Sequence, residues 1–313
     1  MKTYVIVLLA VAMAAILAVM AANIIVDPYN VVHPLLGEYY FEPNSRVPKV
    51  AWLSKNCSRY DSYFVGDSRS ATLSAADLGG AGGRRFYNLS TPADDIGSIV
   101  RRVKFLIGKG CPISTVIAAE SVDVQLDTDE KESYSLLLRE NPAVSGENRL
   151  AFYTRFFLSV QALTTYFRSV GWPRTPRDFY YPDGHVNYYW SMRDGSDFAL
   201  ARCRAPSEAV HASKLLSAKL AGYRDLAELA AARQFKAVVW IAPLNKDKSA
   251  LLDDPEISDF LTRLRDIPNL RLIQADRDSP LLGDFRAWHD CGHFRPIIFD
   301  RLVAPEISQL LKQ

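Results

Sequence analysis

Two short segments at opposite ends of the chain hold residue types that can act together on an ester. The first, Gly66-Asp67-Ser68-Arg69, follows an apolar run, and its serine hydroxyl could act as a nucleophile. The second places Asp290 and His293 three residues apart near the C-terminus. A serine nucleophile needs a base to take its proton, and the base needs a carboxylate to orient it, so His293 and Asp290 fit these two roles. Each segment also has a simpler explanation, because a serine can cap a helix and a histidine can be a surface residue.

The elements around these segments predict an open parallel sheet. Five short apolar segments have the length and composition of buried strands: 63–66, 85–89, 115–119, 237–242 and 270–275. Helical patterns lie between or after them, at 70–78, 96–107, 206–234, 255–267 and 296–311. This alternation is typical of a doubly wound α/β sheet, in which ligands bind beyond the carboxyl ends of the strands. Ser68 and His293 follow the first and the last of these strands, so we expect them to meet at that edge.

An ester hydrolase also needs hydrogen-bond donors for the oxyanion. A helix beginning at Ser70 would direct its free N–H groups toward Ser68. After the second strand, the Ser90 N–H and the Asn88 amide are further candidate donors. Arg69 could bind an anionic group of a substrate, but pairing with Asp67 or another carboxylate is the favoured interpretation.

Neither a cofactor nor a nucleic acid is expected. His289 and His293 with Asp290 could bind a metal ion, but the sequence offers no further matched ligands, so no metal site is predicted. The net charge is +2, and no long block of Lys or Arg could neutralise phosphates.

The N-terminal segment, residues 1–26, predicts a transmembrane anchor. All residues from Tyr4 to Ala22 are apolar, which is long enough for a helix to cross a bilayer core of roughly 30 Å. Cleavage after a site such as Val19-Met20-Ala21 stays open, but signal peptides usually have a shorter apolar region. Lys2 before this segment and Asp27 after it favour a cytosolic N-terminus. We therefore expect a single-pass protein of the cell inner membrane with its C-terminal domain in the periplasm.

The remainder divides into a connector, residues 27–58, and an α/β domain, residues 59–313, with an insertion at about 121–205. The insertion is rich in aromatic residues. Helical spacing over 152–167 favours a small hydrophobic subcore, whereas 179–190 resembles an exposed loop that could line a substrate site. Four cysteines (Cys57, Cys111, Cys203 and Cys291) would meet an oxidising compartment, and the sequence does not choose among their three full pairings.

Gly66-Asp67-Ser68 after the first strand, with Asp290-x-x-His293 near the end, resembles the SGNH (GDSL-type) hydrolase superfamily. The longer motifs Gly-Asp-Ser-Arg-Ser, Asp-Pro-Tyr after the apolar segment, and Asp-x-x-His-Phe-Arg-Pro resemble membrane-anchored SGNH-like proteins of bacterial envelope and polysaccharide loci. The similarity covers most of residues 60–311 in element order. It implies a three-layer flavodoxin-like fold, Ser68 as nucleophile, His293 as base, Asp290 as its orienting carboxylate, and action on ester-linked acyl groups.

Two blocks depart from the family pattern. The second usually brings a Gly whose N–H joins the oxyanion hole, where this chain has Asn88-Leu89-Ser90. The third usually brings an Asn, where this chain has Ala119-Glu120-Ser121, and a Glu120 directed at an oxyanion would oppose it.

The function expected is therefore a serine-dependent esterase or acyltransferase acting on acyl groups, O-acetyl first, of an extracytoplasmic glycan. The alternative is a catalytically impaired module that binds a glycan or an envelope-assembly partner, which the two departures favour. A purely structural envelope protein would leave the Ser and Asp-x-x-His motifs to chance. Hydrogen-bond reach between Ser68 and His293 discriminates between catalysis and binding.

Overall fold

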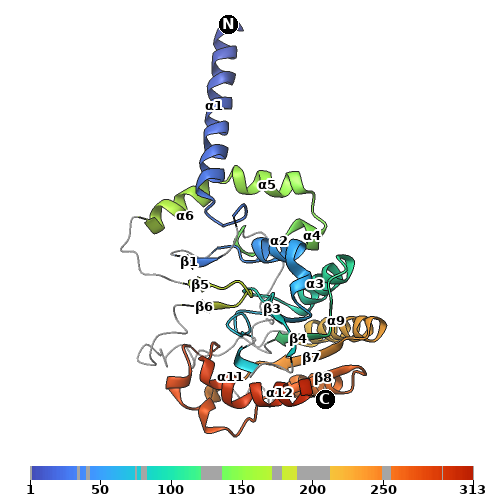
Figure 1. The fold of residues 1–313 in the computed structure, drawn as a ribbon. Helices are drawn as coiled ribbons and strands as arrows, with labels where there is room; N and C mark the ends of the chain where they lie inside the picture. The colour runs from blue at the N-terminus through green and yellow to red at the C-terminus, as the bar shows by residue number, and fades with distance from the viewer. Residues whose placement is uncertain are drawn as a thin grey trace.

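The fold is taken from a computed structural model, which describes residues 2–33, 36–39, 43–74, 76–78, 83–120, 136–170, 178–188, 212–248, 255–290 and 292–312. Five parallel strands form the main sheet (Figure 1): β2 (Ser62–Gly66), β3 (Phe86–Asn88), β4 (Thr115–Glu120), β7 (Lys236–Ile241) and β8 (Leu270–Gln274). All five predicted strands are confirmed. Their order in the sheet is β3-β2-β4-β7-β8. The direction of the crossovers thus reverses between β2 and β4, and such a reversal opens a crevice at the carboxyl ends of the strands.

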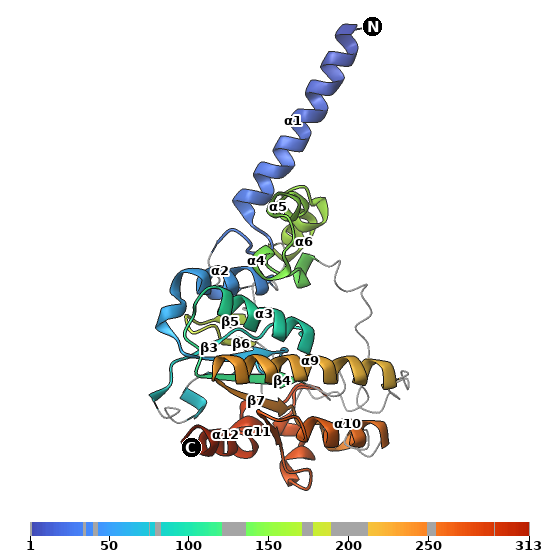
Figure 2. The ribbon, with the colours of Figure 1, turned by 90° about the vertical axis from the view of Figure 1, so that its right-hand side faces the viewer.

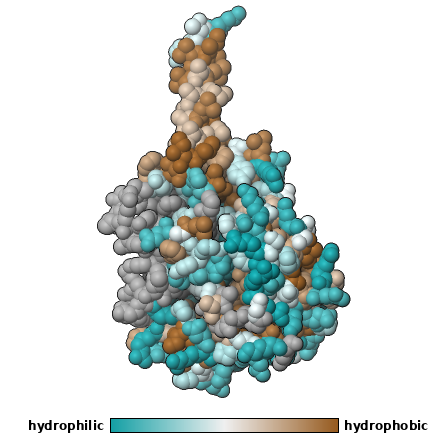
Figure 3. All heavy atoms as spheres, viewed as in Figure 1, coloured by the Kyte–Doolittle hydropathy of each residue, from teal (hydrophilic) through white to brown (hydrophobic). Residues whose placement is uncertain are grey.

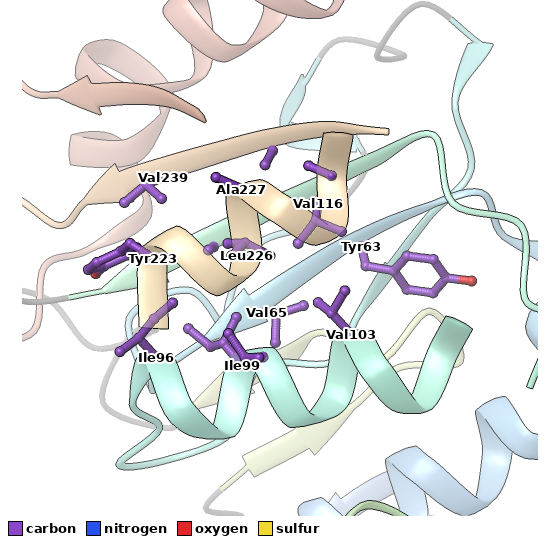
Figure 4. Close-up of a cluster of buried hydrophobic side chains, with 14 of the residues drawn as sticks. Tyr63, Val65, Ile96, Ile99, Val103, Val116, Tyr223, Leu226, Ala227 and Val239 are labelled. Atoms are coloured by element: carbon purple, nitrogen blue, oxygen red, sulfur yellow. The ribbon is translucent and has the colours of Figure 1, made fainter. Parts of the chain in front are cut away.

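Helices cover both faces of this sheet (Figure 2). On one face α3 (Ile96–Gly108), α9 (Ala212–Arg233) and α10 (Pro255–Arg265) pack on alternate strand residues, among them Val116 and Ala118 of β4. Figure 4 shows this cluster between β2, β4 and β7 and the helices α3 and α9. On the other face α11 (Pro296–Leu302) and α12 (Ala304–Lys312) contact the intervening residues. Strands buried on both faces explain the continuous apolar runs in the sequence.

Three predicted helices are confirmed in whole or in part. Segments 96–107 and 255–267 correspond to α3 and α10, and segment 206–234 contains α9, with residues 206–211 outside the described part. The predicted helix 296–311 is divided into α11 and α12 at Val303.

The predicted helix at 70–78 is wrong. Residues 68–72 form turns, and only a short 3-10 helix, Ala76–Leu78, follows. The backbone carbonyl groups of Ser70 and Leu73 accept hydrogen bonds from the Asn88 side chain, and that of Ala71 accepts one from the Val186 N–H. Tertiary partners thus satisfy backbone groups that a helix would have paired internally.

A second, antiparallel sheet joins the connector to the insertion. β1 (Gly37–Tyr39) pairs with β5 (Asp178–Tyr180), which pairs with β6 (Val186–Tyr188). The expectation of an exposed loop at 179–190 is wrong for its described part, 179–188, because Tyr180 and Tyr188 are buried against Ala71. The connector continues after β1 with α2 (Arg46–Asn56) and the 3-10 helix Cys57–Arg59, which lead into β2. The aromatic part 152–167 does contain a small core, since Phe152 and Phe156 pack with Val31 and Val47.

The N-terminal helix α1 (Lys2–Val26) is long and apolar enough to span a membrane, and its apolar side chains are exposed along its length (Figure 3). At its lower end lie α5 (Arg149–Phe157) and α6 (Val160–Val170), preceded by the 3-10 helix Leu136–Leu138 and by α4 (Pro142–Ser145). One disulfide, Cys57–Cys111, is present, with the two Cα atoms 5.4 Å apart. Cys203 and Cys291 lie outside the described residues.

Candidate active site

The turn that carries Ser68 begins at a close contact between strands. Gly66 is paired with Ala119 of β4, and a Cβ at Gly66 would lie 2.1 Å from the Ala119 carbonyl oxygen. Only glycine fits at this position. The Asp67 carboxylate then accepts the Arg69 N–H at 2.9 Å, and the Asp67 carbonyl accepts the Ser70 hydroxyl at 3.0 Å. These bonds close the turn and leave Ser68 half-buried at the carboxyl end of β2, at the crevice where the strand order reverses.

His293 lies on a short hairpin before α11. Trp288 and Phe294 form an antiparallel bridge, and both rings are buried. Phe294 contacts Trp240 of β7, which anchors the hairpin to the sheet, and the His289 N–H donates to the His293 carbonyl at 2.9 Å. The buried aromatic pair therefore fixes the position of a loop whose tip is polar.

The structure brings Ser68, His293 and Asp290 together in one hydrogen-bonded chain. The Ser68 Oγ lies 2.8 Å from the His293 Nε2. On the other side of the ring, the His293 Nδ1 lies 3.0 Å from Oδ2 and 3.1 Å from Oδ1 of Asp290. This order allows Nδ1–H to donate to the carboxylate while Nε2 accepts the serine proton, as a nucleophile–base–carboxylate system requires.

Asp290 is held as a carboxylate. Burial alone raises the pKa of Asp290, but the hydrogen bond and charge of His293 and the backbone N–H groups of Gly292 and His293 outweigh burial and hold its pKa well below the ordinary value. The two N–H groups donate to Oδ1 at 2.7 and 2.8 Å. The loop thus presents to His293 a negative charge that orients the imidazole.

Arg69 joins the two halves of the site. Its guanidinium pairs with Asp67 at 3.3 Å, both side chains being buried, so the predicted pairing with Asp67 is confirmed. Its Nε donates to the carbonyl of Gly292, between Asp290 and His293. Arg69 therefore connects the serine turn to the histidine loop and is a positioning residue; no local sequence pattern indicated its contact with Gly292.

Asn88 and Ser90 do not have the free donors expected of them. Both amide hydrogens of Asn88 are used, by the carbonyl groups of Ser70 at 2.7 Å and Leu73 at 2.8 Å. The Ser90 N–H donates to Asn88 Oδ1 at 2.9 Å. The expectation that these groups hold the oxyanion is therefore wrong for this geometry. Asn88 instead stabilises the serine turn by binding two of its backbone carbonyl groups. No helix follows Ser68 to supply N–H groups either. Within the described residues, the Ser68 N–H has no hydrogen-bond partner and remains the candidate donor.

Glu120, at the end of β4, pairs with Lys219 of α9. The two charged atoms are 3.3 Å apart, and both side chains are buried. Burial raises the pKa of Glu120 to about 7, although the neighbouring Lys219 lowers it. The carboxyl group thus faces the helix that covers β4.

No metal centre is found in the part of the chain that the structure describes, since no three His, Cys, Asp or Glu side chains are grouped there. A cavity between α2 and the β5–β6 hairpin is lined by Trp52, Tyr87 and Tyr181 among others, but its walls do not include Ser68 or His293. Comparison with models of protein families found no match, and comparison with curated proteins found none either.

Proposed function

We propose that the protein is a serine-dependent esterase or acyltransferase of the SGNH type, acting on acyl groups, O-acetyl first, of an extracytoplasmic glycan. The observation that carries the proposal is the hydrogen-bonded chain from Ser68 through His293 to Asp290. The β3-β2-β4-β7-β8 order also agrees with a flavodoxin-like sheet, whose ligand site lies at the strand reversal next to Ser68. Helices on both faces agree with the three-layer arrangement that the resemblance implies.

In this proposal the Ser68 Oγ attacks the acyl carbonyl carbon while its proton passes to the His293 Nε2. Asp290 stabilises the resulting imidazolium, and the Ser68 N–H donates to the oxyanion. When the tetrahedral intermediate collapses, the bond to the sugar oxygen breaks and that oxygen takes the proton from His293. Water or a second sugar hydroxyl then attacks the acyl-serine and gives its proton to His293. The bond between the acyl carbon and the Ser68 Oγ breaks, and Oγ takes that proton back from His293. Hydrolysis and transfer differ only in this last acceptor.

The location outside the inner membrane is part of the proposal. Its supports are the length and apolar character of α1 and the Cys57–Cys111 disulfide, which is typical of an oxidising compartment. The β5–β6 hairpin is the proposed wall for the glycan, because the Val186 N–H donates to the Ala71 carbonyl in the serine turn and so holds the hairpin beside Ser68.

Turnover of acyl esters by the full-length protein in detergent tests the proposal. We expect acetate release from O-acetylated oligosaccharides and from 4-nitrophenyl acetate. Ser68→Ala should lower kcat/KM by at least about 10³-fold. Ser258→Ala, which changes an exposed serine on α10, is the matched control and should have no effect. Equal rates for Ser68→Ala and the parent would overturn the assignment.

The second candidate is a module that binds an acylated glycan without turning it over. It is favoured by the engagement of Asn88 and the Ser90 N–H, because losing an oxyanion donor typically costs about 10²–10³ in rate. The 2.8 Å contact between Ser68 and His293 favours catalysis instead. Retention of an acylated oligosaccharide by the protein, with no acetate released, would select the binding function.

A further inference from the structure

The helices α5 and α6 lie across the end of α1. Figures 1 and 2 show both helices at the base of α1, on the side of the molecule from which α1 projects. The contact is specific, because the Asn23 side chain donates to the backbone carbonyl groups of Phe157 at 2.8 Å and Ser159 at 3.1 Å. Asn23 is the one polar residue between Tyr4 and Val26, and it is buried. The junction of α5 and α6 is thus fixed to α1 three residues before α1 ends.

The two helices have a second apolar face, which no described part of the chain covers. Their inner face supplies Phe152 and Phe156 to the small core. On the outside, four large apolar side chains are 40–77% exposed: Leu150, Leu158, Val160 and Phe167. Beyond α1, only four other large apolar side chains of the described residues are comparably exposed, at Val32, Leu36, Phe285 and Ile297. Exposed apolar side chains are therefore concentrated where α1 leaves the body.

The charged residues within α5 and α6 are all basic, and the nearest carboxylate, Glu147 just before α5, lies 4.0 Å from Arg155. The sequence from 148 to 170 contains Arg149, Arg155 and Arg168 and no Asp or Glu. Helices with an apolar face and only basic charges are typical of segments that lie in the interface of a bilayer containing anionic lipids.

The depth of the junction agrees with such a position. Three residues of α-helix correspond to about 4.5 Å, so the α5–α6 junction lies roughly 5 Å inside the end of α1. Interfacial helices bury their apolar faces about 5–10 Å below the headgroups. The two N–H groups of the Asn23 side chain, which would be costly to leave unpaired in lipid, donate at this depth to the two carbonyl groups, while its Oδ1 is buried without a hydrogen-bond partner.

We propose that α5 and α6 form a membrane-surface collar, with Leu150, Leu158, Val160 and Phe167 in the outer acyl region of the bilayer that α1 spans. Arg149 and Arg155, both exposed, then meet anionic headgroups. One transmembrane helix alone leaves the body free to tilt, whereas a helix and two interfacial elements define a plane. The collar therefore fixes the height and orientation of the body above the membrane. This inference does not depend on the proposed chemistry at Ser68.

Depth-dependent quenching in full-length protein tests the collar. An environment-sensitive fluorescent amino acid is introduced by amber suppression at Leu150 or Phe167, and the protein is placed in nanodiscs containing phosphatidylglycerol and a lipid with a nitroxide at acyl carbon 5. We expect at least a twofold loss of emission at both positions. The matched control is Phe285, a 48% exposed aromatic residue outside the collar, where we expect no loss.

A probe at Ile16 in α1 lies near the bilayer midplane and reports insertion; it should be quenched in matched discs whose lipid carries the nitroxide at acyl carbon 12. Quenching at Ile16 with emission at Leu150 and Phe167 equal to that at Phe285 would overturn the collar. An unquenched Ile16 would also overturn it, because the collar and α1 share one bilayer. In a second variant, Leu150→Asp with Phe167→Asp, a probe at Val160 should lose most of its quenching; undiminished quenching would contradict the assignment of these side chains to lipid.

Discussion

At the scale of single residues, the position of Ser68 depends on side chains outside the Ser68–His293–Asp290 chain. Arg69 bonds to Asp67 on the serine turn and to Gly292 on the histidine loop, while Asn88 holds the carbonyl groups of Ser70 and Leu73. Sequence motifs indicated Ser68, Asp290 and His293, because both short motifs follow predicted strands of one sheet and therefore reach the same carboxyl edge. They did not indicate the role of Asn88, because its partners are determined by how the chain turns after β2.

We predict that Arg69→Lys lowers kcat by about 10²-fold and changes KM little. A lysine can keep the charge opposite Asp67 but cannot also donate from a second nitrogen to Gly292, so the Ser68–His293 distance is no longer fixed, and small misplacements cost about this much. Steady-state kinetics on a soluble acetyl ester measures both constants. Arg286→Lys, at an exposed pair with Asp284, is the control and should retain parental kcat. A loss confined to KM would show that Arg69 binds substrate instead.

Glu120 gives a pH-dependent prediction. Its folded-state pKa of about 7 lies above the ordinary value of 4.5, so the folded protein holds this proton more tightly than the unfolded chain. The corresponding stability is present below pH 4.5 and is lost as the pH rises through about 7. The free energy of unfolding of Glu120→Gln, relative to the parent, should therefore increase by about 1–3 kcal/mol between pH 5 and 8. Urea unfolding at several pH values measures it, and a difference independent of pH would contradict the assignment.

At the scale of elements, burial on both faces made the five strands predictable. The central residues of β4, Val116–Ala119, and of β7, Ala237–Ile241, are consecutive apolar residues buried on both faces, a pattern that a surface element does not show. The sequence was misleading at 70–78 and at 179–188, where the backbone pairs with residues more than ten positions away. Hydrogen bonds such as that from the Val186 N–H to the Ala71 carbonyl cannot be inferred from the residues next to either one in the sequence. The second apolar face of α5 and α6 was missed for a similar reason, because periodicity does not say which of two faces is covered.

The segment after β3 is positioned by a buried charge on α3. Arg102 is fully buried, pairs with Asp94, and donates to Glu140 at 2.7 Å and to the Leu89 carbonyl at 3.0 Å. Replacing it leaves the Glu140 carboxylate without this cation and leaves buried Asp94 with only the 3.5 Å pair to Arg46. We predict that Arg102→Leu lowers the free energy of unfolding by about 3–5 kcal/mol.

Urea unfolding measures this loss, and Lys104→Ala on the same helix is the control. The Lys104–Asp225 pair is 3.8 Å long and half exposed on both sides, so its removal should cost less than about 0.5 kcal/mol. Equal costs for the two variants would show that the buried network does not stabilise this segment.

At the scale of the whole molecule, the candidate active site and the disulfide lie at opposite ends of the main sheet. The Cys57–Cys111 disulfide joins the segments that lead into β2 and β4 at their amino ends, whereas Ser68 follows the carboxyl end of β2. The bridge closes a loop with a sequence separation of 54 residues. Replacing both cysteines by alanine should lower the free energy of unfolding by about 2–4 kcal/mol.

The same double variant should react with a serine-directed probe at the parental rate, because the triad is remote from the bridge. Unfolding curves and labelling rates, measured on one preparation, separate the two effects. A variant of unchanged stability would contradict the stabilising role of the bridge, and slowed labelling at full folding would show that it also positions Ser68.

Covalent labelling by a fluorophosphonate tests the central claim most directly, because the probe needs an activated serine but no knowledge of the natural substrate. The full-length protein is treated with the probe, digested, and the modified peptide is identified by mass spectrometry. We predict one adduct, on Ser68, which is lost in Ser68→Ala and formed at least about 10³-fold more slowly in His293→Ala. Labelling that survives Ser68→Ala, or an adduct on another serine, would contradict the account.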